Sequence, residues 1–157
     1  MENFTVYNPT KLHFGKDVIR KLSDETNDYK SILLVYGKGS IKRNRVYEDI
    51  VKNVSPAAEI YEFSGIKPNP VVEDVKKMSE YAREKKIDLI IAAGGGSVID
   101  SAKILALCVE EAHHPWDIMK GRAKPSVSVP VISVLTLAAT GTEMNPFAVL
   151  QNNDTRE

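Results

Sequence analysis

The chain has 157 residues, 43% of them hydrophobic and 27% charged, which suits a single domain with a substantial core. Its 21 basic and 21 acidic residues give a formal net charge of zero, and there is no basic stripe, so nucleic-acid binding is not expected. No apolar run approaches the roughly 20 residues that cross a bilayer, no signal peptide is visible, and the single Cys108 excludes an internal disulfide, so we expect a cytoplasmic protein without membrane contact.

A hairpin is predicted at the start of the chain. Residues 4–7 and 11–14 are short edge strands around the turn Asn8-Pro9-Thr10. Gly15 ends the hairpin, and residues 17–22 form a short helix. Because an edge hairpin offers free strand edges to a second copy, a homodimer is one expected assembly.

Strands and helices alternate in the next stretch. Residues 31–36 are a continuous apolar run, which predicts a buried strand. The glycine turn Gly37-Lys38-Gly39-Ser40 follows it. A helix is expected over 43–54, and residues 59–63 predict a second strand.

The same alternation continues through the centre of the chain. The Gly- and Pro-containing loop 64–70 leads into a long helix whose apolar positions recur with helical spacing over 71–82. Residues 87–93 predict a buried strand, followed by three glycines at 94–96 and a helix over 97–109.

The last third predicts two further strands. Residues 113–119 begin a loop or short helix, 129–135 form a strand, and 136–144 form a loop of small residues. Residues 147–151 have the pattern of a strand, and 152–154 that of a hairpin turn. No returning strand follows this turn, so we expect the chain to be the N-terminal piece of a longer protein.

Strands alternating with amphipathic helices predict an α/β fold, a Rossmann-like, doubly wound and mainly parallel sheet with the N-terminal hairpin at an edge. The strands are apolar throughout, as in sheets covered on both faces. Such sheets bind ligands at the carboxyl ends of their strands. Four loops of this sequence follow strands and meet at that edge: 37–40, 64–70, 94–97 and 136–142.

The motif Gly94-Gly95-Gly96 is the most informative of these loops. Between a buried strand and a helix, bare backbone N–H groups can bind a phosphate at the positive end of the helix. The spacing matches neither the G-x-G-x-x-G fingerprint nor the P-loop. Ser97 can cap the helix and donate its hydroxyl to a phosphate. Asp100, three residues later, either completes a capping box or acts at the ligand.

The turn Gly37–Ser40 suits the ribose end of a dinucleotide. An acid at such a turn binds the ribose hydroxyls, whereas Ser and basic residues suit a 2′-phosphate. This turn has no acid but has Ser40, with Lys38, Lys42 and Arg43 close by. The sequence therefore favours NADP as the cofactor, with NAD as the alternative.

The three histidines predict neither a metal site nor a catalytic centre. His13 is isolated, and His113 and His114 are neighbours that point in different directions on a regular element. No metal-binding spacing of histidines is present. The sequence therefore shows a cofactor site without an assignable catalytic residue.

Five stretches resemble the iron-containing, metal-dependent (group III) alcohol dehydrogenase family, and within it the butanol dehydrogenase and NADPH-dependent aldehyde reductase branch. These stretches are 14–15, 36–42, 67–70, 94–103 and 135–145. The resemblance implies that residues 1–157 are a dinucleotide-binding domain truncated at its C-terminus. It also implies that a C-terminal helical domain, absent from this chain, carries the metal.

The resemblance further implies a cofactor site. Thr142 lies in this site at a position where the family usually has Ser, and it keeps the hydroxyl group. The matching positions are Gly94, Gly95, Gly96 and Ser97 for the pyrophosphate, Asp100 and Asn145 toward the nicotinamide, Gly37, Gly39 and Ser40 around the adenosine ribose, Pro68 and Asn69 beside the adenine, and Thr136, Leu137, Thr140 and Thr142 along the ribose and adenine.

The implied reaction is hydride transfer between NAD(P)(H) and a small primary alcohol or aldehyde. The family's metal ligands, one Asp and three His, match no position here, so Fe²⁺ or Zn²⁺ is expected only in the full-length protein. This chain alone is expected to bind cofactor without catalysis. Two alternatives remain open: the cofactor domain of a glycerol dehydrogenase or dehydroquinate synthase-like enzyme, and a free-standing nucleotide-binding module.

Overall fold

A computed structural model describes residue 5 and residues 7–157. Four parallel strands form one sheet in the order β2-β1-β3-β4. The strands are β1 (Ser31–Tyr36), β2 (Glu59–Phe63), β3 (Leu89–Gly94) and β4 (Val131–Leu135). The predicted α/β, Rossmann-like parallel sheet is confirmed.

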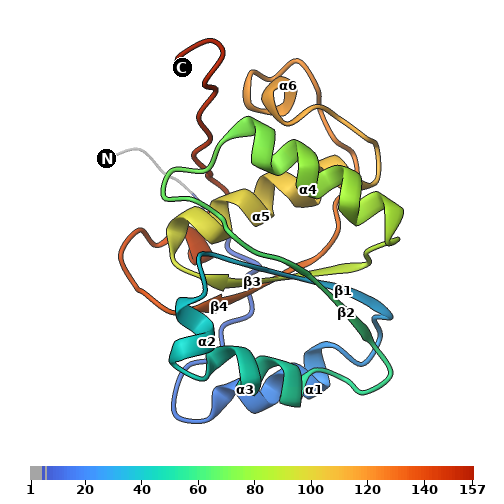
Figure 1. The fold of residues 1–157 in the computed structure, drawn as a ribbon, viewed down its shortest axis with the longest axis vertical. Coiled ribbons are helices and arrows are strands. Elements are labelled where there is room, and N and C mark those ends of the chain that lie inside the picture. Colours follow the sequence, from blue (N-terminus) through green and yellow to red (C-terminus); the bar gives the residue numbers. More distant parts are fainter. Residues whose placement is uncertain (1–4, 6) are drawn as a thin grey trace.

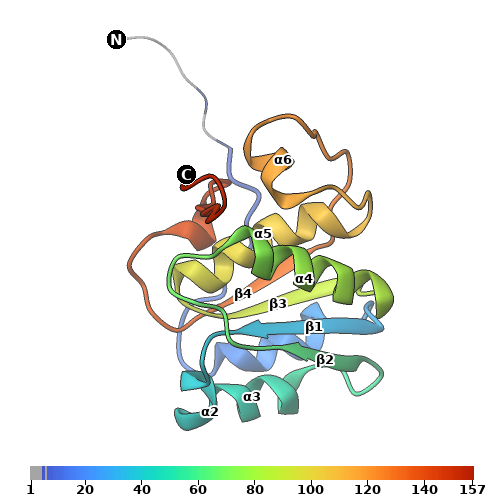
Figure 2. The same cartoon turned by 45° about the horizontal axis from the view of Figure 1, so that its top comes forward.

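Helices cover both faces of the sheet (Figure 1). One face carries α4 (Val72–Glu84) and α5 (Gly96–Val109). The other carries α2 (Ser40–Arg43) and α3 (Val46–Asn53), with η1 (Val18–Lys21) and α1 (Leu22–Glu25). The short α6 (Pro115–Met119) lies on the excursion between α5 and β4, on the side of α5 away from the sheet (Figure 2), and η2 (Thr142–Met144) follows β4.

The core explains why the strands are apolar at every position. Successive side chains of β1 point to opposite faces. Leu33 and Val35 pack on the side of α4 and α5, and Ile32 and Leu34 pack on the side of α2 and α3. All four are fully buried, so neither face of β1 tolerates a polar side chain.

Most predicted elements are confirmed, and the strands at 31–36 and 59–63 have the predicted bounds. The helix predicted over 43–54 is present as α3, which begins three residues later than predicted, and the separate short helix α2 precedes it. Arg45 interrupts them because its φ of 68° lies in the left-handed region, which a helix cannot include. The excursion after α5 forms a short helix, α6, capped by His114, which accepts a hydrogen bond from the Trp116 backbone N–H.

The predicted N-terminal hairpin is wrong where the structure describes it. Residues 11–14 form no strand, and the side chains of Lys11 and His13 both reach Glu25 instead. Thr5 and Tyr7 are not in a strand either, and the remainder of the first predicted strand lies outside the described residues.

The strand predicted over 147–151 is also wrong. Only Gln151 pairs, in a single parallel bridge with Val71. The predicted turn after it is present: the Asn152 side chain accepts hydrogen bonds from the backbone N–H groups of Asp154 and Thr155. Within the described part of the chain, no helix is both long and apolar enough to cross a membrane.

Candidate functional site

The strand order has a switch point at one edge of the sheet, the place where open α/β sheets have a ligand-binding crevice. The connection from β1 leads to β2 on one side, while β3 and β4 lie on the other side of β1. The chain therefore reverses its winding between β1 and β3, and the carboxyl ends of these two strands flank the place where open α/β sheets bind ligands. The four predicted loops all lie at this edge, on the left of the sheet in Figure 1.

The loops are joined to one another by backbone hydrogen bonds. The Gly65 N–H donates to the Gly37 carbonyl (3.1 Å), which links the loops after β2 and β1. The Thr136 N–H donates to the Gly94 carbonyl (3.0 Å), which links those after β4 and β3. The Asn69 N–H donates to Ser97 Oγ (3.3 Å), which connects the two pairs. Hydrogen bonds therefore connect all four loops at this edge of the sheet.

Two of the three consecutive glycines are required by packing within the protein. A Cβ on Gly94 would lie 2.7 Å from Val98 Cγ2, and one on Gly96 would lie 2.7 Å from Thr140 Oγ1. A Cβ on Gly95 would meet only Leu137 Cβ, at an ordinary 3.7 Å. None of the three has a positive φ, so a need for left-handed backbone does not explain them. Internal packing therefore leaves the glycine at 95 unexplained.

The capping box predicted for α5 is not formed. Gly95 is the N-cap residue of α5, and no side chain caps this helix. Ser97 accepts the hydrogen bond from the Asn69 N–H instead, while Asp100 is buried and points elsewhere. Spacing alone suggested the box, but the extra glycine moves the helix start upstream of Ser97.

Asp100 holds the end of the chain's last loop. Its carboxylate accepts hydrogen bonds from the Thr142 hydroxyl (2.5 Å) and from the Val149 backbone N–H (3.1 Å). Thr142 is 4% exposed, so this contact lies in the interior. The predicted ligand role of Asp100 stays a prediction, because both carboxylate oxygens already have partners within the protein.

Lys103, one turn along α5, binds the same segment. Its ammonium donates to the Thr142 hydroxyl and to the carbonyls of Asn145 and Phe147, all at 2.7 Å. Burial lowers the pKa of Lys103, although the charges of Asp100 and Glu143 oppose this. The pair Asp100 and Lys103 therefore positions residues 142–149, including Asn145.

A cavity of about 240 Å³ lies beyond β1, at the turn predicted to suit a ribose. Its lining residues come from the end of β1, the turn, α2 and the loop after β2: Tyr36, Gly37, Lys38, Gly39, Lys42 and Ser64. Ser40 is exposed beside it, at the first position of α2. The structure thus gathers two lysines at this cavity, as the turn sequence suggested.

The structure also brings an acid into contact with two residues that line this cavity, Tyr36 and Lys42, which the turn sequence did not indicate. Glu62 of β2 accepts hydrogen bonds from the hydroxyls of Tyr36 and Tyr47, both at 2.6 Å, and pairs with Lys42 Nζ at 3.4 Å. Burial raises the pKa of Glu62, but the two hydroxyls and the ammonium of Lys42 together bring it below its ordinary value. Glu62 is therefore ionised near neutral pH.

The remaining predicted site residues lie on the loops at this edge of the sheet. The members that are exposed to solvent are Pro68, Asn69, Thr136, Leu137 and Thr140. The sequence did not indicate that Glu62 and Tyr47 lie near this site, or that Lys103 holds the loop after β4. No local sequence signal identifies Glu62. It lies beside Leu34 in the parallel register of β1 and β2, and this register is known only once the sheet has formed.

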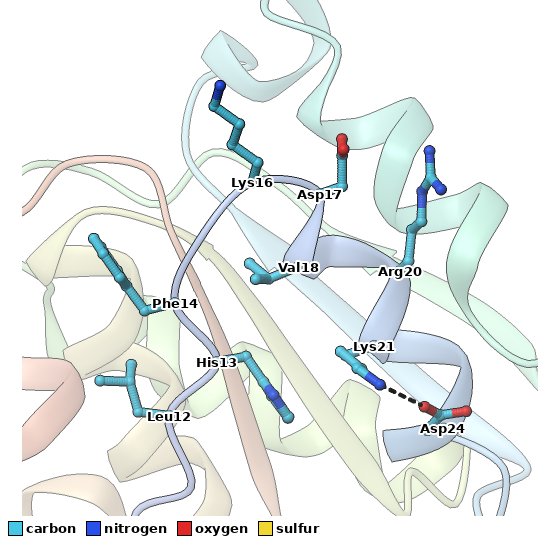
Figure 3. A pocket seen from close by; sticks show the side chains of 9 residues that line it. All are labelled: Leu12, His13, Phe14, Lys16, Asp17, Val18, Arg20, Lys21 and Asp24. Carbon is cyan, nitrogen blue, oxygen red and sulfur yellow. Dashed lines mark ion pairs between the residues drawn. The ribbon is translucent and has the colours of Figure 1, made fainter.

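A larger cavity, of about 540 Å³, lies elsewhere (Figure 3). Its lining residues all fall between Leu12 and Asp24, on the extended N-terminal segment and on η1 and α1. None of them belongs to the four loops. It is wide open to solvent, and its one ion pair joins Lys21 to Asp24 (3.5 Å).

The histidines are used in local contacts. His13 contacts Glu25 and His113 contacts Glu111, both at 3.0 Å, and His114 caps α6. Within residues 5 and 7–157, no three metal-ligating side chains gather in one place. These residues therefore do not fit the metal that the resemblance implies.

Comparison with known proteins gives a consistent result. The family model for iron-containing alcohol dehydrogenase matches residues 9–157. All of this chain aligns at 46% identity with "Probable NADH-dependent butanol dehydrogenase 2" of Bacillus subtilis, and 99% of it at 35% identity with "NADPH-dependent aldehyde reductase YqhD" of Escherichia coli. The chain covers 41% of the length of each relative.

Solved structures agree with the sequence relatives. The crystal structure of NADH-dependent butanol dehydrogenase A from Thermotoga maritima matches with a TM-score of 0.93 at 41% identity. That match covers 100% of this chain and 40% of the solved one. A sulfoacetaldehyde reductase from Bifidobacterium kashiwanohense, solved with NAD⁺, matches with a TM-score of 0.89 at 25% identity.

Proposed function

Because the chain belongs to the iron-containing alcohol dehydrogenase family, we propose that residues 1–157 form the dinucleotide-binding part of an NAD(P)-dependent alcohol dehydrogenase or aldehyde reductase. The reaction of the whole protein is then hydride transfer between C4 of the nicotinamide and the carbon of a small primary alcohol or aldehyde. Relatives named as butanol dehydrogenases and as an aldehyde reductase support this substrate class.

One observation carries the proposal: Gly95 has no neighbour that explains its missing side chain. It is the N-cap residue of α5, a helix of 14 residues that begins at the crevice between β1 and β3. A diphosphate accepted by the free N–H groups of this helix start needs the space that a Cβ on Gly95 would fill. Gly95, Gly96 and Ser97 are then the pyrophosphate contacts.

The other predicted residues act around this centre. The adenosine ribose occupies the cavity beside Gly37, Gly39 and Ser40, and the adenine lies near Pro68 and Asn69. Thr136, Leu137 and Thr140 border the crevice from the β4 side. Lys103, through its bonds to Thr142 and Asn145, keeps the last loop in the position where Asn145 can border the nicotinamide.

The form of the cofactor is the finer part of the proposal. The NADP preference expected from sequence is supported by Lys38 and Lys42, which line the ribose cavity. Glu62 works against it, since its carboxylate pairs with Lys42. The names of relatives include both NADH- and NADPH-dependent enzymes, so either form is compatible with the family.

The experiment that tests the proposal is a titration of this chain with NADH and NADPH, followed by nicotinamide fluorescence. We expect saturable binding of at least one form by the unchanged chain. Gly95→Ala is expected to weaken binding at least tenfold while lowering the free energy of unfolding by only about 1 kcal/mol, since Ala is a poorer N-cap residue than Gly but its Cβ meets no protein atom closely.

Gly94→Ala provides the matched contrast. Its Cβ would overlap Val98, so we expect a loss of about 1–3 kcal/mol in unfolding free energy, measured by thermal or urea denaturation. Failure of the unchanged chain to bind either dinucleotide would overturn the proposal. Equal binding by the Gly95→Ala chain would remove the pyrophosphate assignment.

We also propose that this chain alone binds cofactor without turning over substrate, since its described residues do not gather metal ligands. An assay with NADPH, Fe²⁺ or Zn²⁺ and a short aldehyde tests this, and metal-dependent turnover would contradict it. The homodimer and the cytoplasmic location expected from the sequence stay predictions.

A further inference from the structure

The side chain of Glu62 lies at the junction of four elements. It projects from β2 on the face covered by α2 and α3, and its two oxygens accept the hydroxyls of Tyr36 on β1 and Tyr47 on α3. Both bonds are 2.6 Å long, as expected for hydroxyl donors to an ionised carboxylate. The position of this negative charge is therefore well determined.

Lys42 of α2 is held by the same group. Its ammonium lies 3.4 Å from Glu62 Oε2, 4.4 Å from the centre of the Tyr47 ring and 5.2 Å from that of the Tyr36 ring. A carboxylate and the negative faces of two aromatic rings all attract one ammonium group. Lys42 is thus directed into this cluster although it lines the cavity at the end of β1.

The cavity consequently differs from what its two lysines suggest. A 2′-phosphate bound there carries up to two negative charges and needs cations that are free to pair with it. Lys42 already has an anionic partner, and the charge of Glu62 repels a phosphate. Lys38, which has no ion-pair partner among the described residues, is the remaining cation on the cavity lining. A ribose with a free 2′-hydroxyl does not meet this repulsion.

We propose that Glu62 is a positioning residue that biases this site toward the dinucleotide without a 2′-phosphate, by engaging Lys42 in the cluster with Tyr36 and Tyr47. This inference rests on the proposed function, since it concerns the ribose end of the same cofactor. It makes NADH the preferred form. NADPH still binds, because Lys38 and Ser40 lie at the cavity.

The test compares the dissociation constants of NADH and NADPH for five forms of the chain by nicotinamide fluorescence. The unchanged chain is expected to bind NADH more tightly. Glu62→Gln keeps the shape and removes the charge, and should shift the ratio of the two constants toward NADPH by about three- to tenfold. Glu59→Gln, on the same strand but at its other end, is the matched control and should leave the ratio unchanged.

The role of Lys42 is tested by the double variant. If Glu62→Gln acts by releasing Lys42, then adding Lys42→Met should return most of the gained NADPH affinity. A purely structural effect of Glu62 would weaken both cofactors together and leave the ratio as it was. Glu62→Asp keeps the negative charge and should therefore keep the NADH preference. Thermal melting of each variant identifies those that have lost the fold.

The outcomes separate the two proposals. Absence of binding by the unchanged chain overturns the proposed function itself. Binding of both cofactors with tighter NADPH in the unchanged chain, or an unaltered ratio in folded Glu62→Gln, overturns the role of Glu62 alone. If the shift in the ratio of the two dissociation constants persists in the double variant, the Glu62 carboxylate acts without Lys42. That result overturns the proposed role of Lys42.

Discussion

Asp100, Lys103 and Thr142 show how a few side chains set the shape of a loop. The Thr142 hydroxyl donates to Asp100 and accepts from Lys103, so each group in the chain of bonds has a partner. Burial makes such a network valuable only while it is complete, because a single unpaired group costs its full desolvation. The burial that lowers the pKa of Lys103 belongs to the same arrangement.

Thr142→Val tests the network at the level of one atom. Valine keeps the size of the side chain but removes one hydrogen bond from Asp100 and one from Lys103, so we expect a loss of about 1–3 kcal/mol in unfolding free energy. Urea denaturation measures it. Thr136→Val is the control, since Thr136 is exposed and should change stability by less than about 0.5 kcal/mol. Equal effects of the two substitutions would contradict the network.

At the scale of elements, the sequence predicts short strands between turns well, whether the strand is buried like β1 or partly exposed like β2. The runs at 31–36 and 59–63 have the predicted bounds because continuous apolar or alternating residues next to a turn leave few other structures. The predicted strand at 147–151 fails for a tertiary reason. Lys103 binds the Phe147 carbonyl and Asp100 binds the Val149 N–H, so side chains take the backbone groups that a neighbouring strand would need.

The candidate site also has a part that the sequence predicts and a part that depends on the tertiary structure. The glycine loops could be found from the sequence because short spacing along the chain defines them. Glu62 could not, since it meets Tyr36 at the end of β1 only when β1 and β2 pair in register, and 26 residues separate the two along the chain. Local signals place a turn, whereas the charge of a cavity depends on which strands become neighbours.

The excursion from 111 to 126, which contains α6, is closed by one carboxylate. Glu111 accepts hydrogen bonds from the side chain and the backbone N–H of Ser126, and contacts His113. These bonds, the Ser126 hydroxyl first, lower the pKa of Glu111 below its ordinary 4.5. A lowered pKa in the folded state means that this contribution is present above pH 4.5 and is lost as pH falls below it through the folded value.

We therefore expect Glu111→Gln to increase proteolysis within residues 111–126 at pH 7, because a neutral amide holds Ser126 less firmly. The difference from the unchanged chain should shrink as the pH falls below 4.5 through the folded value, because protonation then removes the charge that the variant lacks. Limited proteolysis with an acid-stable and a neutral protease, read by mass spectrometry, measures it. Glu110→Gln, at an exposed neighbouring position, is the control. A difference that does not shrink as the pH is lowered would show that the charge is not responsible.

At the scale of the whole molecule, the crevice joins parts of the chain that are far apart in sequence. It is bordered by loops that follow all four strands and are tied by three backbone-centred hydrogen bonds. A ligand held by these loops cannot stay bound when the sheet comes apart. Binding should therefore stabilise the fold as a unit and not one loop alone.

Thermal melting with cofactor measures this coupling. At a concentration of about 100 times the dissociation constant, binding to the folded state alone adds about 2.7 kcal/mol. For a chain of 157 residues this corresponds to a rise in Tm of roughly 5–11 °C. Adenosine, which lacks the diphosphate, serves as the control and should produce a smaller rise at equal concentration. A Tm that is independent of dinucleotide concentration would contradict a site built from all four loops.

The strand order has a consequence for the synthesis of the protein on the ribosome. β1 emerges early, but its inner neighbour β3 ends only at Gly94, 58 residues after Tyr36. At about 5–20 residues per second, one edge of the apolar strand β1 stays unpaired for roughly 3–12 seconds, until β3 has been synthesised. During that interval it is a natural target for chaperones that hold growing polypeptides, and slowing translation between the two strands should raise the yield of aggregated product.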